Sequence, residues 1–182
     1  AAALRSAGAV GFYFVLVMGM FDFSIGAAII LASIYGCKLA ASMGLGYMGL
    51  IGGCLIAGAI IGILNGVFYI KLRIPSMIVT TGLALIYEAT AEAISANIIA
   101  GGVEQTLPSD LRMFGQMPGN LILAVLTFAA AYFILTYTKI GTYTYAIGSN
   151  EFIAKNMGIN VNKYKVLAFV ISGIFFGIMS IL

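Results

Sequence analysis

The sequence predicts an all-α, polytopic membrane protein, from its hydropathy, the lengths of its apolar runs and the polar residues that separate them. Of its 182 residues, 62% are hydrophobic and only 8% are charged, and the mean hydropathy is +1.11. Soluble domains carry about 25% charged residues, and a soluble fold this apolar would expose large hydrophobic patches. The chain is therefore expected to lie in a lipid bilayer.

Six apolar runs are candidate membrane helices, because about 20 apolar residues cross a bilayer. The runs are Gly8–Met20, Ser24–Ala41, Gly46–Ile70, Met77–Ala100, Pro118–Tyr137 and Val166–Leu182. The first is short, and the last reaches the end of the sequence. We expect about five or six transmembrane helices in one domain over residues 1–182, which we interpret as a segment of a longer protein, incomplete at both ends.

Polar turns separate these runs, and their charges predict which side of the membrane each turn faces. Basic residues gather in two segments that are two crossings apart, so the positive-inside rule places both on the cytoplasmic side. They are Lys71, Arg73, Lys139, Lys155, Lys163 and Lys165. The intervening loop, residues 101–119, carries Glu104, Asp110 and a single Arg112, so we expect it on the extracytoplasmic side.

Glycines recur at four-residue spacing in two of the runs. Gly58, Gly62 and Gly66 lie on one face of the third run, and Gly173 and Gly177 lie in the last run. Small residues at this spacing let two membrane helices approach closely. These five glycines are therefore predicted to form helix-packing surfaces rather than to contact a solute.

Sequence patterns that mark catalysis or metal binding are missing. The chain contains no His, and Cys37 and Cys54 lie in apolar runs without CxxC or Cys/His spacing, which indicates buried thiols. It has no G-x-S-x-G and no phosphate-binding G-x-x-x-x-G-K-[ST] sequence. Its net charge of +3 is not concentrated in a basic patch, which argues against a nucleic-acid partner. We expect no catalytic residue, no metal and no cofactor bound by this chain.

One polar stretch, Thr144–Lys165, interrupts the apolar sequence on the predicted cytoplasmic side. Asn150 is a favourable N-cap and Gly158 a favourable residue just after a helix end, which predicts a helix of about two turns between them. Glu151 and Lys155 have the spacing of an i,i+4 ion pair. The apolar side chains of this helix form one strip, made of Phe152, Ile153 and Met157.

A helix this short is not stable by itself, so its apolar strip must rest on another surface. The residues alone leave two surfaces equally open. One is the protein's own membrane domain or the lipid interface. The other is a soluble cytoplasmic partner.

Asp22 and Ser24 lie between the first two apolar runs. A carboxylate at membrane depth is costly, so it is expected to turn inward or to lie at an interface. One interpretation is an interfacial Asp22 that caps the helix starting near Ser24. The other is a discontinuous helix at a cavity, where Asp22 and the helix N-terminus bind solute hydroxyls.

Glu88 and Glu92 lie four residues apart on one face of the fourth run, with Glu88 near its middle. Three interpretations stay open: pairing with another segment or a second copy of the chain, contact with a solute, and proton handling. Other polar residues of the spans are candidates for the same solute path, although such residues more often bond a neighbouring helix. They are Asn65, Thr80, Thr81 and Tyr87.

Four stretches carry recognisable motifs in a fixed order. FDFSIGA (Phe21–Ala27) matches I-D-L-S-V-G, and GILNGVFYIKLRIPSMIVTTGLALIY (Gly62–Tyr87) matches L-N-G…K-x-x-I-P-x-F-I-x-T-L-G. TKIGTYTYAIG (Thr138–Gly148) matches x-T-x-x-G-x-x-x-Y-A-I-G, and AIGSNEFIAKNMGINV matches A-I-G-x-N-x-x-A-A-x-x-x-G-I-x-V. Together they resemble permease subunits of bacterial ABC importers of the ribose, galactose and xylose type. The resemblance covers nearly the whole chain, which would be somewhat more than half of a full permease.

The resemblance implies that residues 138–165 form a cytoplasmic coupling loop whose short helix sits in a groove of an ATP-binding subunit. The residues that would form this contact are Asn150, Glu151, Phe152, Ile153, Lys155, Met157 and Gly158. The implied partners are an ABC ATPase that uses ATP and Mg²⁺, an extracytoplasmic solute-binding protein that docks on residues 101–119, and a second permease copy. The implied location is the inner membrane of a bacterium.

The resemblance also implies import of a simple sugar or similar small polar solute by alternating access. Permeases for nucleosides and branched-chain amino acids share the broader architecture. Related permeases often carry a basic residue where Glu88 stands, so this sequence departs from the family there. An ion-coupled secondary transporter, with Glu88, Glu92 or Asp22 carrying a proton, is the alternative, although such a carrier does not need a capped helix shaped for an ATPase.

Overall fold

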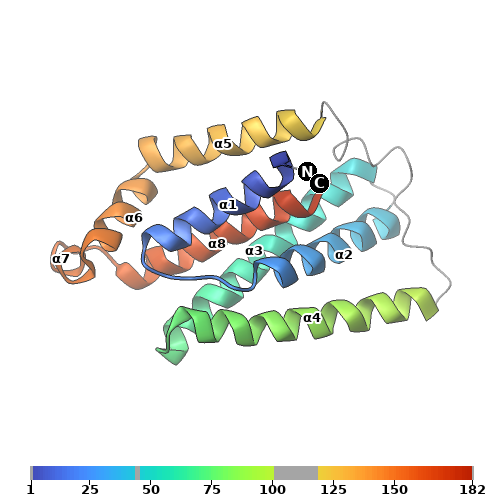
Figure 1. The fold of residues 1–182 in the computed structure, drawn as a ribbon, viewed down its shortest axis with the longest axis horizontal. Coiled ribbons are helices and arrows are strands. Elements are labelled where there is room, and N and C mark those ends of the chain that lie inside the picture. The colour runs from blue at the N-terminus through green and yellow to red at the C-terminus, as the bar shows by residue number, and fades with distance from the viewer. Residues whose placement is uncertain (1, 44–45, 101–118, 182) are drawn as a thin grey trace.

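Figure 1 shows a computed structural model of the chain, which describes residues 2–43, 46–100 and 119–181. In these residues the secondary structure is helical, without strands. The helices are α1 (Ala2–Val17), α2 (Ile25–Met43), α3 (Gly46–Leu72), α4 (Ser76–Ala100), α5 (Gly119–Tyr137), α6 (Lys139–Ser149), α7 (Glu151–Asn156) and α8 (Val161–Ile181). The predicted all-α fold class is confirmed.

The long helices lie roughly side by side along the long axis of the molecule (Figure 1). α3 and α8 pack against each other at the centre, α1 packs on α8, and α2 packs on α3. α4 packs on α2 and α5 packs on α1, so these two helices form opposite edges of the bundle. The α3–α4 turn lies at the same end of the bundle as α6 and α7. The two lysine-containing segments of the sequence are therefore neighbours at one end, as the predicted topology requires.

Three helices are long and apolar enough to cross a membrane: α3, the Ser76–Ala96 part of α4, and α8. α5 and α6 together make a fourth such unit, which is bent by 72° where they meet, and α1 and α2 contain shorter apolar helices. The helix bounds differ from the sequence prediction by a few residues, most at α1 and at α8, which begins at Val161 instead of Val166. The structure therefore has the form of a multi-pass helical membrane protein.

Glycines let the two central helices meet backbone to backbone. A Cβ atom on Gly58 would lie 2.2 Å from the carbonyl oxygen of Gly173, and one on Gly62 would lie 2.3 Å from that of Phe169. The other three glycines of the predicted packing surfaces also lie against backbone atoms of the facing helix. A Cβ on Gly66 would lie 2.9 Å from Val166 Cα, one on Gly173 2.2 Å from Gly58 O, and one on Gly177 2.5 Å from Cys54 O. Such distances leave room only for hydrogen at these positions.

The segment before Asn150 is helical, whereas the sequence interpretation placed it in a coupling loop over residues 138–165 and named no helix before Asn150. α6 contains Thr, Tyr and Gly, which are weak helix formers, so local propensity did not indicate it. The helix is held by its surroundings instead: Gly141 and Gly148 lie directly against the carbonyl oxygens of Leu135 and Val17. The polar stretch thus consists of α6, α7 and the start of α8, and α6 projects α7 away from the spans (Figure 1).

Candidate functional site

α7 is a short helix with a cap at each end. The Ile153 N–H donates to the Asn150 side-chain oxygen over 3.1 Å, which makes Asn150 the N-cap. At the other end Gly158 has φ +84°, and its N–H donates to Lys155 O while the Ile159 N–H donates to Ala154 O. This pair of bonds is a Schellman motif, which favours glycine at the left-handed position. Both ends of α7 are therefore fixed although it has only 6 residues.

The apolar strip of α7 points away from the protein's own helices. Phe152, Ile153 and Met157 are 73%, 56% and 75% exposed, whereas Ala154, on the opposite side, is 1% exposed. Ala154 packs with Ile147 of α6 and with Val161 and other core residues. The strip therefore does not rest on the spans of this chain, and in the described residues it forms an uncovered apolar surface at the tip of the molecule.

An ion pair connects the start of α7 to α8. Lys165 Nζ lies 2.8 Å from Glu151 Oε2, and the Lys165 side chain is only 10% exposed. The same ammonium lies 5.6 Å from the centre of the Tyr69 ring on α3. The predicted pairing of Glu151 with Lys155 is therefore wrong. A surface i,i+4 pair contributes only about 0.3–0.5 kcal/mol. Lys165 is buried, so water screens its interaction with Glu151 less than it would screen a pair with the exposed Lys155.

A buried polar cluster joins three segments of the bundle: the stretch between α1 and α2, helix α3 and helix α4. Asp22 is 2% exposed, and its Oδ1 accepts from the Ser24 N–H at 2.9 Å and from the Ser24 hydroxyl at 2.6 Å. Asn65 Nδ2 donates to Asp22 Oδ2 at 3.1 Å and to Ser24 Oγ at 2.7 Å. The Tyr87 hydroxyl donates to Asn65 Oδ1 at 2.9 Å. We call Asp22, Ser24, Asn65 and Tyr87 the polar cluster.

The polar cluster lies inside the bundle and not at its end. Asn65 is about 10 Å of helix rise from the end of α3 at Leu72, at 1.5 Å per residue. In Figure 1 the segment after α1 enters the bundle, and α2 begins part-way along it. The Asp22 carboxylate therefore bonds to Ser24, the residue directly before α2. It does so within the bundle and not at its end.

The remaining solute-path candidates of α4 face two directions. Thr80 is fully buried, and its hydroxyl accepts from the Phe23 N–H at 3.0 Å. Thr81, Glu88 and Glu92 are exposed on the outer face of α4. Thr81 donates to the carbonyl oxygen of Met77 in its own helix, and neither glutamate forms an ion pair or hydrogen bond within the described part of the chain. The structure therefore separates Glu88 and Glu92 from the polar cluster.

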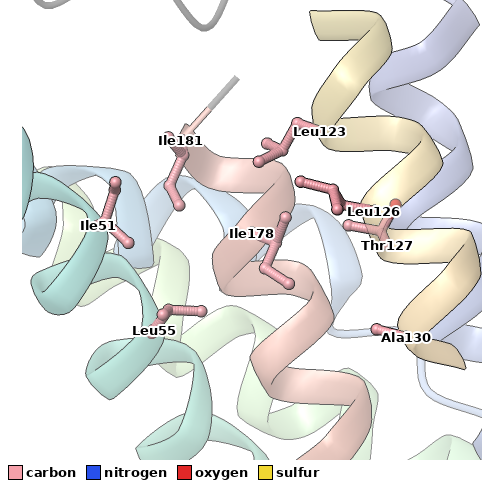
Figure 2. A pocket seen from close by; sticks show the side chains of 8 residues that line it. All are labelled: Ile51, Leu55, Leu123, Leu126, Thr127, Ala130, Ile178 and Ile181. Carbon is pink, nitrogen blue, oxygen red and sulfur yellow. The ribbon is translucent and has the colours of Figure 1, made fainter. Parts of the chain in front are cut away.

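Two grooves in the described residues are apolar. The first, of about 260 Å³, lies between α5, α3 and α8 and is shown in Figure 2, where Leu126, Ile178 and Leu55 point into it. Its only hydroxyl, on Thr127, donates to Ala124 O. The second, of about 470 Å³, lies between α2, α3 and α4 and includes Tyr87. Neither groove gathers the polar groups that a hydrated sugar requires.

Two features were not found from the sequence. Gly36 of α2 and Gly53 of α3 meet closely, since a Cβ on Gly53 would lie 2.8 Å from Gly36 Cα. The two glycines of α2, Gly26 and Gly36, are ten positions apart and gave no spacing signal. Asn160 caps α8 by accepting from the Lys163 N–H at 3.2 Å, and an Asn before an apolar run is a signal that could have found it. The predicted docking loop lies almost entirely outside the described residues, in 101–118.

The fold and these features define a class of protein: a multi-pass helical membrane protein with a capped helix presented at one end of its bundle. The chain belongs to the family described as the permease component of the branched-chain amino acid transport system, which it matches over residues 2–182. The resemblance to ABC importer permeases predicted from the motifs is confirmed by this match and by the individual relatives.

Those relatives are named as permeases for sugars. The chain is 30% identical over 178 residues to the ribose import permease protein of Haemophilus influenzae, covering 91% of this chain and 52% of the relative. It is 29% identical to the galactofuranose transporter permease protein of Escherichia coli, covering 91% and 49%, and 31% identical to the fructose import permease protein of Rhizobium meliloti, covering 84% and 45%. It thus spans about half the length of these relatives. No solved structure matches it.

Proposed function

We propose that this chain is part of the transmembrane subunit of an ATP-driven importer in a bacterial inner membrane, which passes a simple sugar or similar small polar solute by alternating access. The observation that carries the proposal is α7, with its two caps and its outward apolar strip. A carrier driven by ions has no use for such a helix. The relatives named as sugar import permeases support the choice of solute class over nucleosides and branched-chain amino acids.

α7 is the proposed contact with the ATPase subunit, which uses ATP and Mg²⁺. Phe152, Ile153 and Met157 enter an apolar groove of that subunit, because they are exposed on the side opposite the buried Ala154. Lys155 and the exposed part of Glu151 contact the rim. The caps at Asn150 and Gly158 fix the angle of the helix, so a rigid-body movement of the ATPase displaces α7 as a unit. Further partners are a second permease copy and an extracytoplasmic binding protein.

Glu88 and Glu92 are the proposed contacts for the solute among the candidate path residues. Carboxylates within a span face a water-filled cavity or another protein rather than lipid, and these two project from the outer face of α4. The carboxylates accept hydrogen bonds from sugar hydroxyls. Asp22, Ser24, Asn65 and Thr80 have their polar groups bonded inside the bundle and are proposed to support the path instead of contacting the solute.

The proposed function predicts ATP-dependent uptake by the reconstituted full-length transporter. The permease, its ATPase and its binding protein are placed in proteoliposomes, and uptake is measured over a panel of pentoses and hexoses. We expect uptake of at least one sugar that requires ATP and the binding protein and persists when the proton gradient is collapsed. Uptake that follows a proton gradient and ignores ATP would overturn the proposal in favour of a secondary transporter.

Removing both caps of α7 is expected to uncouple ATP hydrolysis from transport. In the double variant Asn150→Ala with Gly158→Val, loss of the N-cap costs about 1 kcal/mol and the left-handed residue costs about 1–2 kcal/mol. A six-residue helix does not survive both losses, whereas the contacts that the spans make with one another are unchanged. Uptake should fall to background while ATPase activity and thermal stability of the membrane domain persist. Asn156→Ala, an exposed substitution in the same helix, is the matched control and should transport normally; unchanged uptake by the double variant would remove α7 from the mechanism.

A further inference from the structure

The inner side of α7 does not pack on α8 alone. Ala154 lies in one core cluster with Val15, Met18 and Met20, which are the last turn of α1 and the start of the segment that follows it. Gly148, two residues before the N-cap of α7, lies directly against the Val17 carbonyl oxygen. A displacement of α6 and α7 is therefore expected to push directly on the backbone at the end of α1, because no side chain lies between the backbones at Gly148 and Val17. We call residues 18–24, between α1 and α2, the connector.

The near end of the connector is rigid. Gly19 has φ +74°, its N–H donates to Leu16 O at 2.9 Å, and the Met20 N–H donates to Val15 O at 3.2 Å. These two bonds form a Schellman motif, so the turn out of α1 is locked. The connector consequently moves with the end of α1 instead of bending away from it.

The far end of the connector is fastened to α4 and to the polar cluster. The Phe21 N–H donates to Ser76 Oγ at 2.9 Å, and the Phe23 N–H donates to Thr80 Oγ1 at 3.0 Å. Both hydroxyls are in the first turns of α4, and both side chains are buried. Between these two bonds, Asp22 joins the cluster through Asn65. The backbone of one short segment thus bonds to α4, while its carboxylate bonds to α3.

We propose that the connector is the element that transmits the displacement of α7 to the start of α2 and to α4, with Ser76 as a positioning residue that fastens it. This inference rests on the proposed function, because it assumes that α7 is moved by an ATPase. Hydrogen bonds and packed backbones form a contiguous path from Ala154 to the polar cluster, and networks of this kind can carry energetic coupling between two sites. The helix that carries Glu88 and Glu92 is the same α4 to which the connector is bonded.

Hydrogen exchange with and without ATP tests the proposal on the assembled transporter. In the wild-type complex, ATP should change exchange both in α7 and in residues 21–28, which cover the connector and the start of α2. In Ser76→Ala the response in α7 should remain, and the response of residues 21–28 should be lost, together with solute uptake. Ser76→Thr keeps the accepting hydroxyl and should restore both. Gly148→Ala forces a Cβ onto the Val17 carbonyl oxygen and separates α6 from the end of α1. We expect this variant also to keep the response in α7 and to lose the response of residues 21–28 and solute uptake.

The control is Gly82→Ala, on the exposed side of α4, where an added Cβ meets nothing within 4 Å and should change neither response. A response of residues 21–28 that persists in both Ser76→Ala and Gly148→Ala would overturn the role of the connector, even if uptake is ATP-driven. A wild-type complex that shows no ATP-dependent uptake and no ATP response in α7 would instead overturn the proposed function. The two failures are therefore distinguishable.

Discussion

Gly62→Ala is expected to lower the free energy of unfolding by about 3 kcal/mol, the upper part of the usual range for overpacking a core. The added Cβ would lie 2.3 Å from the Phe169 carbonyl oxygen and 2.8 Å from Val170 Cα. Both atoms belong to the backbone of α8, so no side chain can rotate away. α3 and α8 must separate, and their packing is the centre of the bundle. The loss should appear as a lower melting temperature of the purified protein in detergent.

Gly52→Ala on the same helix is the matched control. An alanine Cβ at Gly52 meets nothing within 4 Å, and alanine is a better helix former than glycine by about 1 kcal/mol. This variant should therefore be as stable as the wild type or slightly more stable. Equal melting temperatures for the two variants would mean that α3 and α8 are not in backbone contact at Gly62.

The contrast between these two glycines shows how far the sequence predicts the fold. Four-residue spacing was enough to mark Gly62 as a packing residue and to leave Gly52 out, because spacing fixes the face of a helix. It did not say which helix lies opposite, since that depends on how the whole chain folds back. Gly36 has no glycine four positions before or after it, so the spacing did not indicate its contact with Gly53.

At the candidate sites, too, the sequence predicts the local interactions but not the long-range ones. The caps at Asn150 and Gly158 are predictable because each depends on residues within one turn of the cap. The predicted ion-pair partner of Glu151 was wrong. Its actual partner, Lys165, is 14 positions away and is brought near by the turn between α7 and α8. Asp22 and Asn65 are 43 positions apart. Their bond follows from the packing of the connector on α3, which no short pattern encodes.

Asn65→Leu is expected to be the most damaging substitution in the polar cluster. Leucine has the same branching and the same number of side-chain heavy atoms as asparagine, but it can neither donate to Asp22 and Ser24 nor accept from Tyr87. The buried Asp22 carboxylate would lose its bond from α3, and the Tyr87 hydroxyl would lose its acceptor. Leaving a buried hydrogen-bonding group without its partner typically costs about 1–3 kcal/mol, and more where the group is charged, and this substitution affects more than one such group. We expect the melting temperature and the yield of folded protein to fall sharply.

Two graded comparisons separate loss of the cluster from a general effect of mutating a span. Tyr87→Phe removes one hydroxyl and leaves Asp22 bonded to Asn65, so it should cost about 1 kcal/mol. Thr81→Val removes a hydroxyl that bonds only to its own helix at Met77 O on the exposed face of α4, so its effect should be near zero. The order Asn65→Leu, Tyr87→Phe, Thr81→Val follows from the number of buried groups that each change leaves unpaired. If Asn65→Leu were as stable as Thr81→Val, Asp22 could not depend on Asn65, and α2 would have to be held at its start by Ser24 and the α4 hydroxyls alone.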